Sequence, residues 1–105
     1  LNEITGGFGI SLEEKNIPVR KDVKSICELL GFDPLYIANE GKFIAIVPDK
    51  YKEIALSAVK KHKFGRNASI IGEVVKEPKK VFMKTLAGGT RVVDMPVADQ
   101  IPRIC

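Results

Sequence analysis

The apolar residues of this chain follow a period of two in some segments and a helical period in others, and this alternation restricts the possible fold most. Phe8, Ile10 and Leu12 alternate along residues 7–13 and predict a strand with glycine at its entry. Pro18 then suits the first turn of a helix, and Gly31 suits the position just after its end. Between them, apolar residues recur at helical spacing: Val19, Val23, Ile26, Cys27 and Leu30.

Two short apolar runs and a second helix follow. Residues 35–38 and 42–47 are separated by Asn39-Glu40-Gly41-Lys42, which has the composition of a hairpin turn. A second helix is predicted to start with Asp49 as its N-cap and to end at Phe64-Gly65. Its buried face would be formed by apolar residues at helical spacing: Tyr51, Ile54, Ala55, Ala58 and Val59.

The remaining predicted elements are strands. Residues 68–75 and 81–86 read as strands, and Gly88-Gly89 joins the second of them to residues 90–94. The predicted order is β-α-β-β-α-β with an added C-terminal hairpin. This order indicates an α+β fold with a split βαβ, ferredoxin-like core.

The length of 105 residues is suited to one domain with its own core. Residues 1–95 would form that domain. Residues 96–105 contain two prolines and no clean apolar period, so we expect an exposed, flexible tail that carries Cys105. The longest uncharged apolar stretch, residues 43–48, is far too short to span a bilayer, and no secretory signal is visible. A cytoplasmic protein without a membrane partner is therefore expected.

The net charge of +4 arises from 17 basic and 13 acidic residues, most of them scattered. One basic cluster stands out, formed by Lys60-Lys61-His62-Lys63 and Arg66. Nucleic-acid-binding faces usually interleave basic and aromatic residues, whereas this chain has no tryptophan and few other aromatics. We therefore expect no nucleic-acid partner, and we interpret the cluster as a solvated helix end whose cations suit the helix dipole.

Two cysteines and one histidine limit the chemistry available to the chain. Cys27 and Cys105 cannot form a disulfide framework, and zinc needs about four ligands, so no metal site is expected. Cys27 lies on the apolar face of the first helix, where a free cysteine behaves as a small hydrophobe. Cys105 is either an inert end or a thiol that enters a narrow pocket. Arg103 would favour its thiolate, and an adjacent α-carboxylate would oppose it.

Four segments carry a specific pattern: Pro34-Leu35-Tyr36-Ile37-Ala38-Asn39-Glu40-Gly41-Lys42, Gly72-Glu73-Val74, residues 88–94, and Gln100-Ile101-Pro102-Arg103-Ile104-Cys105. In this order they resemble the C-terminal domain of the HypE family, the carbamoyl dehydratases of nickel–iron hydrogenase maturation. The resemblance covers the whole chain, although Ala98-Asp99 stands where the family usually has Gly-Glu. It implies the fold of the C-terminal domain of aminoimidazole ribonucleotide synthetase-like proteins.

The resemblance also implies a reaction, in which Cys105 accepts a carbamoyl group from the carbamoyltransferase HypF. ATP then phosphorylates the thiocarboxamide oxygen, a base removes the amide protons, and loss of phosphate leaves a thiocyanate. The cyano group passes to iron on a HypC–HypD scaffold. ATP, with Mg²⁺, would be bound mainly by an N-terminal domain absent from this chain, which has no Gly-x-x-x-x-Gly-Lys-Ser/Thr loop. The isolated domain is therefore expected to be inactive.

Further residues receive candidate roles. Glu40 is either the base of the dehydration, or a group that orients the substrate nitrogen, or simply a solvated turn residue. Asn39, Arg91 and Arg103 would position the substrate or the tail. Gly88-Gly89 is explained by a tight hairpin, yet its N–H groups with Arg91 could also hold a phosphate. The alternative function is a non-catalytic binding module of the same fold.

Overall fold

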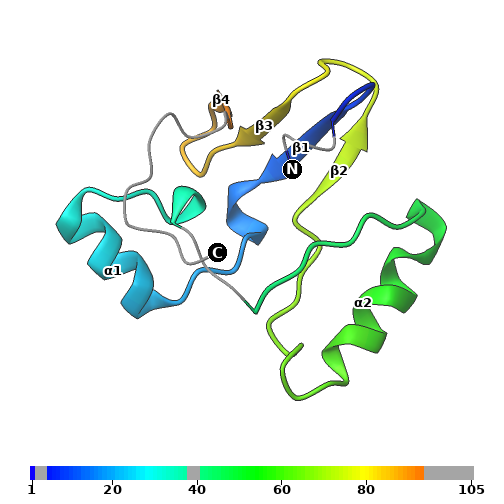
Figure 1. Cartoon of the computed structure of the whole chain (residues 1–105), viewed down its shortest axis with the longest axis horizontal. Helices are drawn as coiled ribbons and strands as arrows, with labels where there is room; N and C mark the ends of the chain where they lie inside the picture. The colour runs from blue at the N-terminus through cyan, green and yellow to red at the C-terminus, as the bar shows by residue number, and fades with distance from the viewer. Residues whose placement is uncertain (2–4, 38–40, 94–105) are drawn as a thin grey trace. The chain divides into compact units, whose positions relative to one another are not determined.

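The computed structural model describes residue 1, residues 5–37 and residues 41–93 (Figure 1). These residues form two compact units. The first unit is built from the chain up to residue 18 and from residues 47–93, and it contains the whole sheet and the second helix. The second unit is built from residues 19–46 and contains the first helix.

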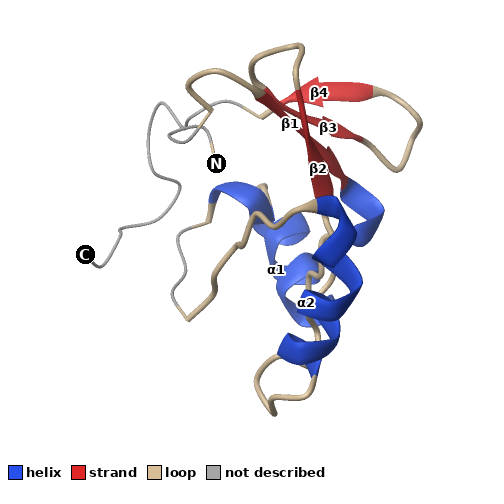
Figure 2. Ribbon diagram, turned by 90° about the vertical axis from the view of Figure 1, so that its right-hand side faces the viewer, coloured by secondary structure: helices blue, strands red, loops and turns tan. Residues whose placement is uncertain are grey.

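The first unit is organised around a four-stranded mixed sheet (Figure 2). Its strands are β1 (Gly9–Glu13), β2 (Gly72–Val75), β3 (Val81–Lys84) and β4 (Thr90–Val92), in the order β2-β1-β3-β4. β1 pairs antiparallel with β2 and parallel with β3, and β4 pairs antiparallel with β3. The α+β class and the hairpin at Gly88-Gly89 are thereby confirmed, whereas the strands predicted at 68–75 and 81–86 are shorter than expected.

The core of this unit lies on one face of the two central strands. Ile10 pairs with Val81 and Leu12 with Met83, so all four side chains share a face, and each is at most 5% exposed. The opposite face carries Ser11, which alternates with the core residues of β1. The period of two in the sequence thus corresponds to an apolar face and a polar face of the same strand.

The second helix differs from its prediction in its start and its burial. A 3-10 turn, η4 (Asp49–Tyr51), precedes α2 (Lys52–Lys60), and Pro48 rather than Asp49 occupies the cap position of that turn. The predicted end at Phe64-Gly65 is also wrong, because α2 stops at Lys60. Most of the predicted buried face is exposed, since Ile54 is 69% exposed and Tyr51 about half exposed.

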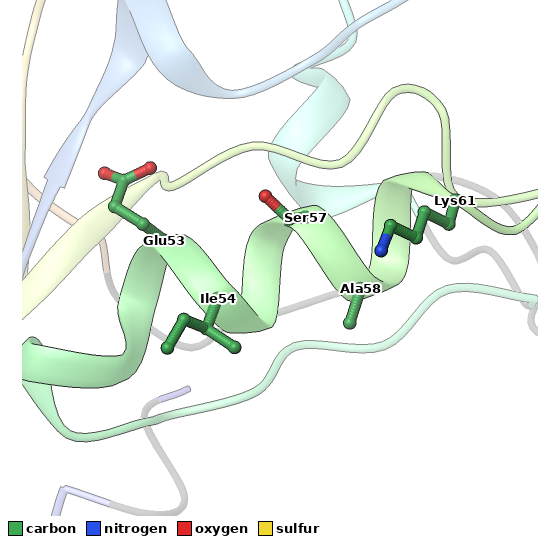
Figure 3. A pocket seen from close by; sticks show the side chains of 5 residues that line it. All are labelled: Glu53, Ile54, Ser57, Ala58 and Lys61. Carbon is green, nitrogen blue, oxygen red and sulfur yellow. The ribbon is translucent and has the colours of Figure 1, made fainter.

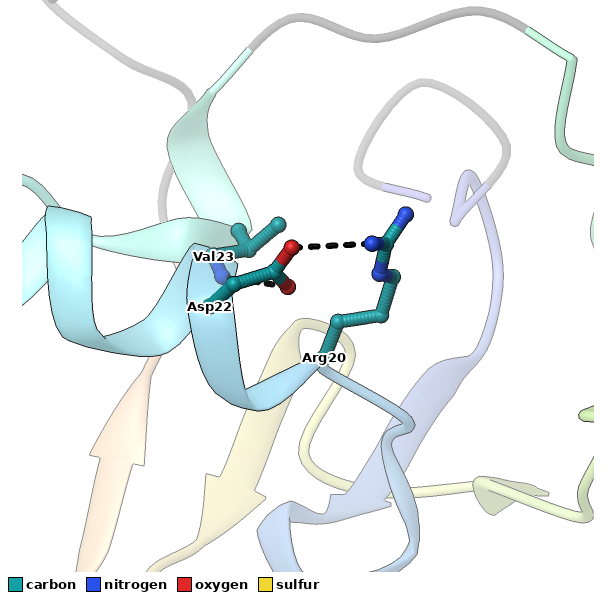
Figure 4. A network of polar contacts seen from close by, with 3 residues as sticks. All are labelled: Arg20, Asp22 and Val23. Carbon is teal, nitrogen blue, oxygen red and sulfur yellow. Dashed lines mark hydrogen bonds and ion pairs between the residues drawn. The ribbon is translucent and has the colours of Figure 1, made fainter.

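In the second unit, α1 (Lys21–Leu30) begins three residues after Pro18, which is not the first helical residue. Asp22 lies in the first turn, where its carboxylate accepts from the Val23 amide at 2.9 Å and from the Arg20 guanidinium at 2.8 Å (Figure 4). A carboxylate at this end also suits the helix dipole. The end of the helix is as predicted, with Gly31 in the left-handed region at φ +73°.

The burial of α1 confirms the prediction for Cys27 but not the prediction that the whole apolar face of the helix is covered. Cys27 is only 2% exposed, which confirms its assignment to the core. The remaining apolar residues of the predicted face are each more than a third exposed: Val19, Val23, Ile26 and Leu30. The helical period therefore located the helix correctly but overstated how much of its face is covered within this chain.

The hairpin predicted over residues 35–47 is wrong. Asp33 caps a 3-10 turn, η3 (Pro34–Tyr36), by accepting from the Leu35 amide at 3.0 Å, and the described residues 41–48 contain no strand. An isolated pair of strands is marginal in water unless a third strand or a helix supports it. The predicted ferredoxin-like order is therefore wrong between α1 and α2, because the described residues there form no pair of strands.

We expect Gly72→Ala to destabilise the first unit, because a Cβ at Gly72 would run into the backbone carbonyl of Ser11 on the neighbouring strand. Overpacking of this kind costs about 1–3 kcal/mol. Urea unfolding monitored by circular dichroism would measure the loss. Gly7→Ala is the matched control, since nothing lies within 4 Å of a Cβ at Gly7. Equal midpoints for the two variants would contradict the close approach of β1 and β2.

Candidate functional site

Most of the site residues suggested by the sequence lie outside the described residues. Asn39, Glu40, Arg103 and Cys105 belong to this group. Arg91 is the one candidate that the structure places, on β4. The structure therefore gives the position of Arg91 alone, and the roles of all five residues remain predictions.

Arg91 is exposed on the edge strand of the sheet. It pairs with Met83, so its side chain starts from the same face of the sheet as the buried core residues of β1 and β3. A guanidinium at a sheet edge is well suited to paired hydrogen bonds with a carboxylate or a phosphate. The fold thus places a permanent positive charge at the edge of the apolar face.

The turn between β3 and β4 is held by hydrogen bonds within itself. Gly88 donates its N–H to the Thr85 carbonyl at 3.0 Å, and Gly89 donates its N–H to the Thr85 hydroxyl at 3.1 Å. Gly88 also adopts a φ of +93°, which favours glycine. Both N–H groups that could have formed an anion-binding nest are thus already engaged, so the tight-hairpin interpretation explains these glycines.

A polar hollow of about 200 Å³ lies on the other face of the sheet, within the first unit. Ser11, Glu13 and Glu73 line it from β1 and β2. Ser11 and Glu73 are paired across the two strands, and Glu13 forms an ion pair with Lys84 at 3.6 Å. Asp49 and Lys52 line the same hollow from the start of α2. The hollow therefore combines three carboxylates with one ammonium.

The charges in this hollow are already partly balanced. Lys52 Nζ lies 3.0 Å from Asp49 Oδ1, and this hydrogen bond and charge raise the pKa of Lys52 above its ordinary value. Glu53 and Glu73 act in the same direction more weakly. Among the residues that the structure describes, no three His, Cys, Asp or Glu side chains are grouped as a metal ion would need.

The sequence did not identify this polar cluster, although one signal was available. Ser11 and Glu13 alternate along β1 with the apolar residues of that strand. Their side chains therefore lie on the same face of the sheet. Their meeting with Glu73 depends on the antiparallel register of β1 and β2, and their meeting with Asp49 depends on the packing of α2. Neither can be read from local spacing.

A second, shallower hollow of about 340 Å³ runs along α2 (Figure 3). Glu53, Ser57 and Lys61 follow one another at i, i+4 and i+8, while Ile54 and Ala58 form the adjacent apolar row. Because all five come from one helix and the turn after it, the hollow is an open surface.

Neither of the two helices that the structure describes is long and apolar enough to cross a membrane.

Comparison with known proteins identifies the architecture. The family described as AIR synthase related protein, C-terminal domain, matches residues 1–84. The carbamoyl dehydratase HypE of Azotobacter vinelandii is 50% identical over 108 residues, which cover 100% of this chain and 32% of that protein. The chain thus spans about a third of the length of the curated relatives it matches.

Two solved structures extend the likeness to three dimensions. A crystal structure of the hydrogenase maturation protein HypE in complex with ATP has a TM-score of 0.90 and 39% identity, covering 100% of this chain and 33% of that chain. A crystal structure of a HypE–HypF complex has a TM-score of 0.85 and 45% identity, covering 91% of this chain and 32% of that chain. The α+β architecture described above is therefore that of the corresponding part of these proteins.

We expect Asp49→Asn to lower the pKa of Lys52 towards the ordinary lysine value of 10.5, because the substitution removes the carboxylate that contributes most to raising it. NMR titration of the lysine side-chain resonances would measure the change. Because the pKa is raised in the folded protein, any stabilisation is present below pH 10.5 and is lost as the pH rises through the folded value. Asp22→Asn is the control, and an equal shift of Lys52 in both variants would contradict the pairing.

Proposed function

The chain belongs to the family of AIR synthase related protein C-terminal domains, and from that premise we propose that it is the C-terminal domain of a carbamoyl dehydratase of nickel–iron hydrogenase maturation. The observation that carries this proposal is the match to HypE over 100% of the chain at 50% identity, which includes the Pro-Arg-Ile-Cys segment. Because the chain spans about a third of such a protein, we propose that an N-terminal ATP-binding domain completes the enzyme.

Cys105 is the proposed acceptor of the carbamoyl group. Its thiolate attacks the carbonyl carbon of the activated carbamoyl donor, and the bond from that carbon to the donor's oxygen leaving group breaks, with the electron pair leaving on that oxygen. The product is an S-carbamoyl cysteine, which is a thiocarboxamide. Arg103, two residues away, favours the thiolate by its charge. The other cysteine is unsuited to this role, because Cys27 is buried in the structure.

Dehydration then removes the oxygen and both protons of the amide. The thiocarboxamide oxygen takes the γ-phosphoryl group of ATP, which turns it into a leaving group. Glu40 is the proposed base for the nitrogen protons, with Asn39 beside it to orient the amide. Loss of phosphate and of the second proton forms the carbon–nitrogen triple bond of the thiocyanate.

Arg91 is the proposed partner of the charge that develops on the phosphorylated oxygen. Its guanidinium stands on an edge strand, and a bidentate donor of this kind stabilises a transferring phosphoryl group. Mg²⁺ is expected to accompany ATP on the N-terminal domain. Among the described residues, no three His, Cys, Asp or Glu side chains are grouped so that they could hold it.

The proposed partners act in sequence. The carbamoyltransferase HypF supplies the carbamoyl group, and the HypE–HypF crystal structure, which contains a protein similar to this chain, supports that pairing. The HypE–ATP structure supports ATP as the phosphoryl donor. A HypC–HypD complex is the proposed acceptor of the cyano group, which must leave the Cys105 sulfur for iron.

Carbamoylation can be tested directly in the full-length protein that contains this chain. After incubation with carbamoyl phosphate, ATP and HypF, intact mass spectrometry should show the gain of one carbamoyl group. Cys105→Ala should abolish the gain, and Cys27→Ala is the matched control that should keep it. An adduct on Cys27, or no adduct on the unaltered protein, would contradict the proposal and favour a non-catalytic binding module of this fold.

Arg91→Gln should lower the rate of thiocyanate formation by between about 10- and 100-fold, because it removes one charged donor from a developing negative charge. The rate of carbamoylation should not change, since that step precedes phosphorylation. Thr90→Ser, on the same strand, is the control for general disturbance of β4. Quenched-flow mass spectrometry would measure both steps, and an equal loss in the two steps would indicate that Arg91 supports the fold rather than the dehydration.

A further inference from the structure

The polar hollow contains one carboxylate whose charge no described residue balances. Of the three carboxylates that line it, Glu13 forms an ion pair with Lys84 at 3.6 Å. Asp49 forms one with Lys52 at 3.0 Å. Glu73, the third carboxylate, forms no ion pair with any residue that the structure describes. One negative charge is therefore left over in the hollow, and it lies on Glu73.

Ser11 is the most deeply enclosed side chain of the hollow. It is only 6% exposed, and no side-chain hydrogen bond in the described part of the chain reaches its hydroxyl. The described side chains include no fully enclosed N or O atom without a partner, so this hydroxyl keeps access to the hollow that Ser11 lines. A hydroxyl this deep costs stability unless water or a ligand forms a hydrogen bond with it.

The register of β1 and β2 brings these two groups together, because Ser11 and Glu73 lie directly opposite each other. Opposed residues of antiparallel strands have their Cβ atoms about 4.5–5.5 Å apart and their side chains on one face. Gly72 allows this close approach, since a Cβ there would run into the Ser11 carbonyl oxygen. On the rim, the Asn16 carbonyl accepts from the Ser69 hydroxyl at 2.5 Å. Both acceptors thus stand on a fixed backbone.

The chemistry of the hollow favours one class of ligand over the others. An anion would be repelled by the charge on Glu73. A metal ion is less fitting, because no three His, Cys, Asp or Glu side chains of the described residues are grouped to hold one. Water alone would form hydrogen bonds with the Ser11 hydroxyl but would leave the carboxylate without a counter-charge. An ammonium or guanidinium group offers both a positive charge and several N–H donors.

We propose that the polar hollow binds one singly charged organic cation, whose N–H groups donate to the Glu73 carboxylate and the Ser11 hydroxyl. Its volume of about 200 Å³ is below that of pockets for drug-sized ligands and suits a group of a few heavy atoms. Because the chain spans about a third of its curated relatives, the cation is either a free small amine or a lysine or arginine side chain from the rest of the protein. The site is independent of the proposed function, in which neither residue has a role.

The test uses the full-length protein that contains this chain, with ethylammonium as the probe. Tetramethylammonium is the control, because it has the same charge but no N–H donor. The amide chemical shifts of Ser11 and Glu73 in deuterated protein report binding. A site for a free amine should bind ethylammonium alone. Glu73→Gln should then raise the Kd at least about tenfold, and Ser11→Ala about three- to tenfold, as expected for the loss of a charged and a neutral acceptor.

Urea unfolding of the same variants distinguishes the second source. If a side chain of the protein itself fills the hollow, ethylammonium should not bind, and both Glu73→Gln and Ser11→Ala should lower the unfolding midpoint. Glu77→Gln is the matched control, because Glu77 is an exposed carboxylate of the same unit that lies outside the hollow.

Two results would overturn the proposal. The first is a hollow that holds only water. Ethylammonium would then not bind, Glu73→Gln would behave like Glu77→Gln, and Ser11→Ala would be neutral or stabilising, because it removes a hydroxyl that lacks a partner. The second is equal binding of ethylammonium and tetramethylammonium, which would show attraction by charge without the two acceptors.

Discussion

The parallel pairing of β1 with β3 is the interaction on which the rest of the described structure depends. These strands are far apart in the sequence, and their register places Ile10 beside Val81 and Leu12 beside Met83. Those four side chains form the buried face of the sheet, and a shift by one residue would send them all to the polar side. The positions of β2 and β4, which pair with the outer edges of this central pair, follow from it.

The same pairing determines which side chains lie on each face of the sheet. Because β1 alternates, fixing its apolar face also fixes Ser11 and Glu13 on the other face, where they meet Glu73 and line the polar hollow. On the apolar face, β4 extends the sheet to its edge and carries Arg91 beyond the last buried residue. Arg91 is exposed at that position, so the fold does not bear the cost of burying its guanidinium.

Local spacing predicted those features that depend on a single segment. The alternation along β1, the helical period around Cys27 and the left-handed Gly31 are of this kind, and the structure has all three. Strands at 42–47 were predicted on the same local grounds and are absent, because a strand needs a neighbour and the sequence does not say whether one is present. The polar hollow required register and helix packing together, which no local pattern contains. The proposed roles of Glu40 and Cys105 came from a family resemblance alone.

Two exposed segments of the described chain differ in composition. On α1 and residues 43–47 the exposed side chains are large and apolar, among them Ile26, Leu29 and Phe43. Surfaces of that composition are typical of interfaces that stay covered. Residues 60–66 have a different composition, because Phe64 is exposed there among four cations that form no ion pair with the described residues. Under the proposed function the domain must remain attached to its own enzyme while it passes a group from one protein to another, and the apolar surface is suited to that lasting attachment.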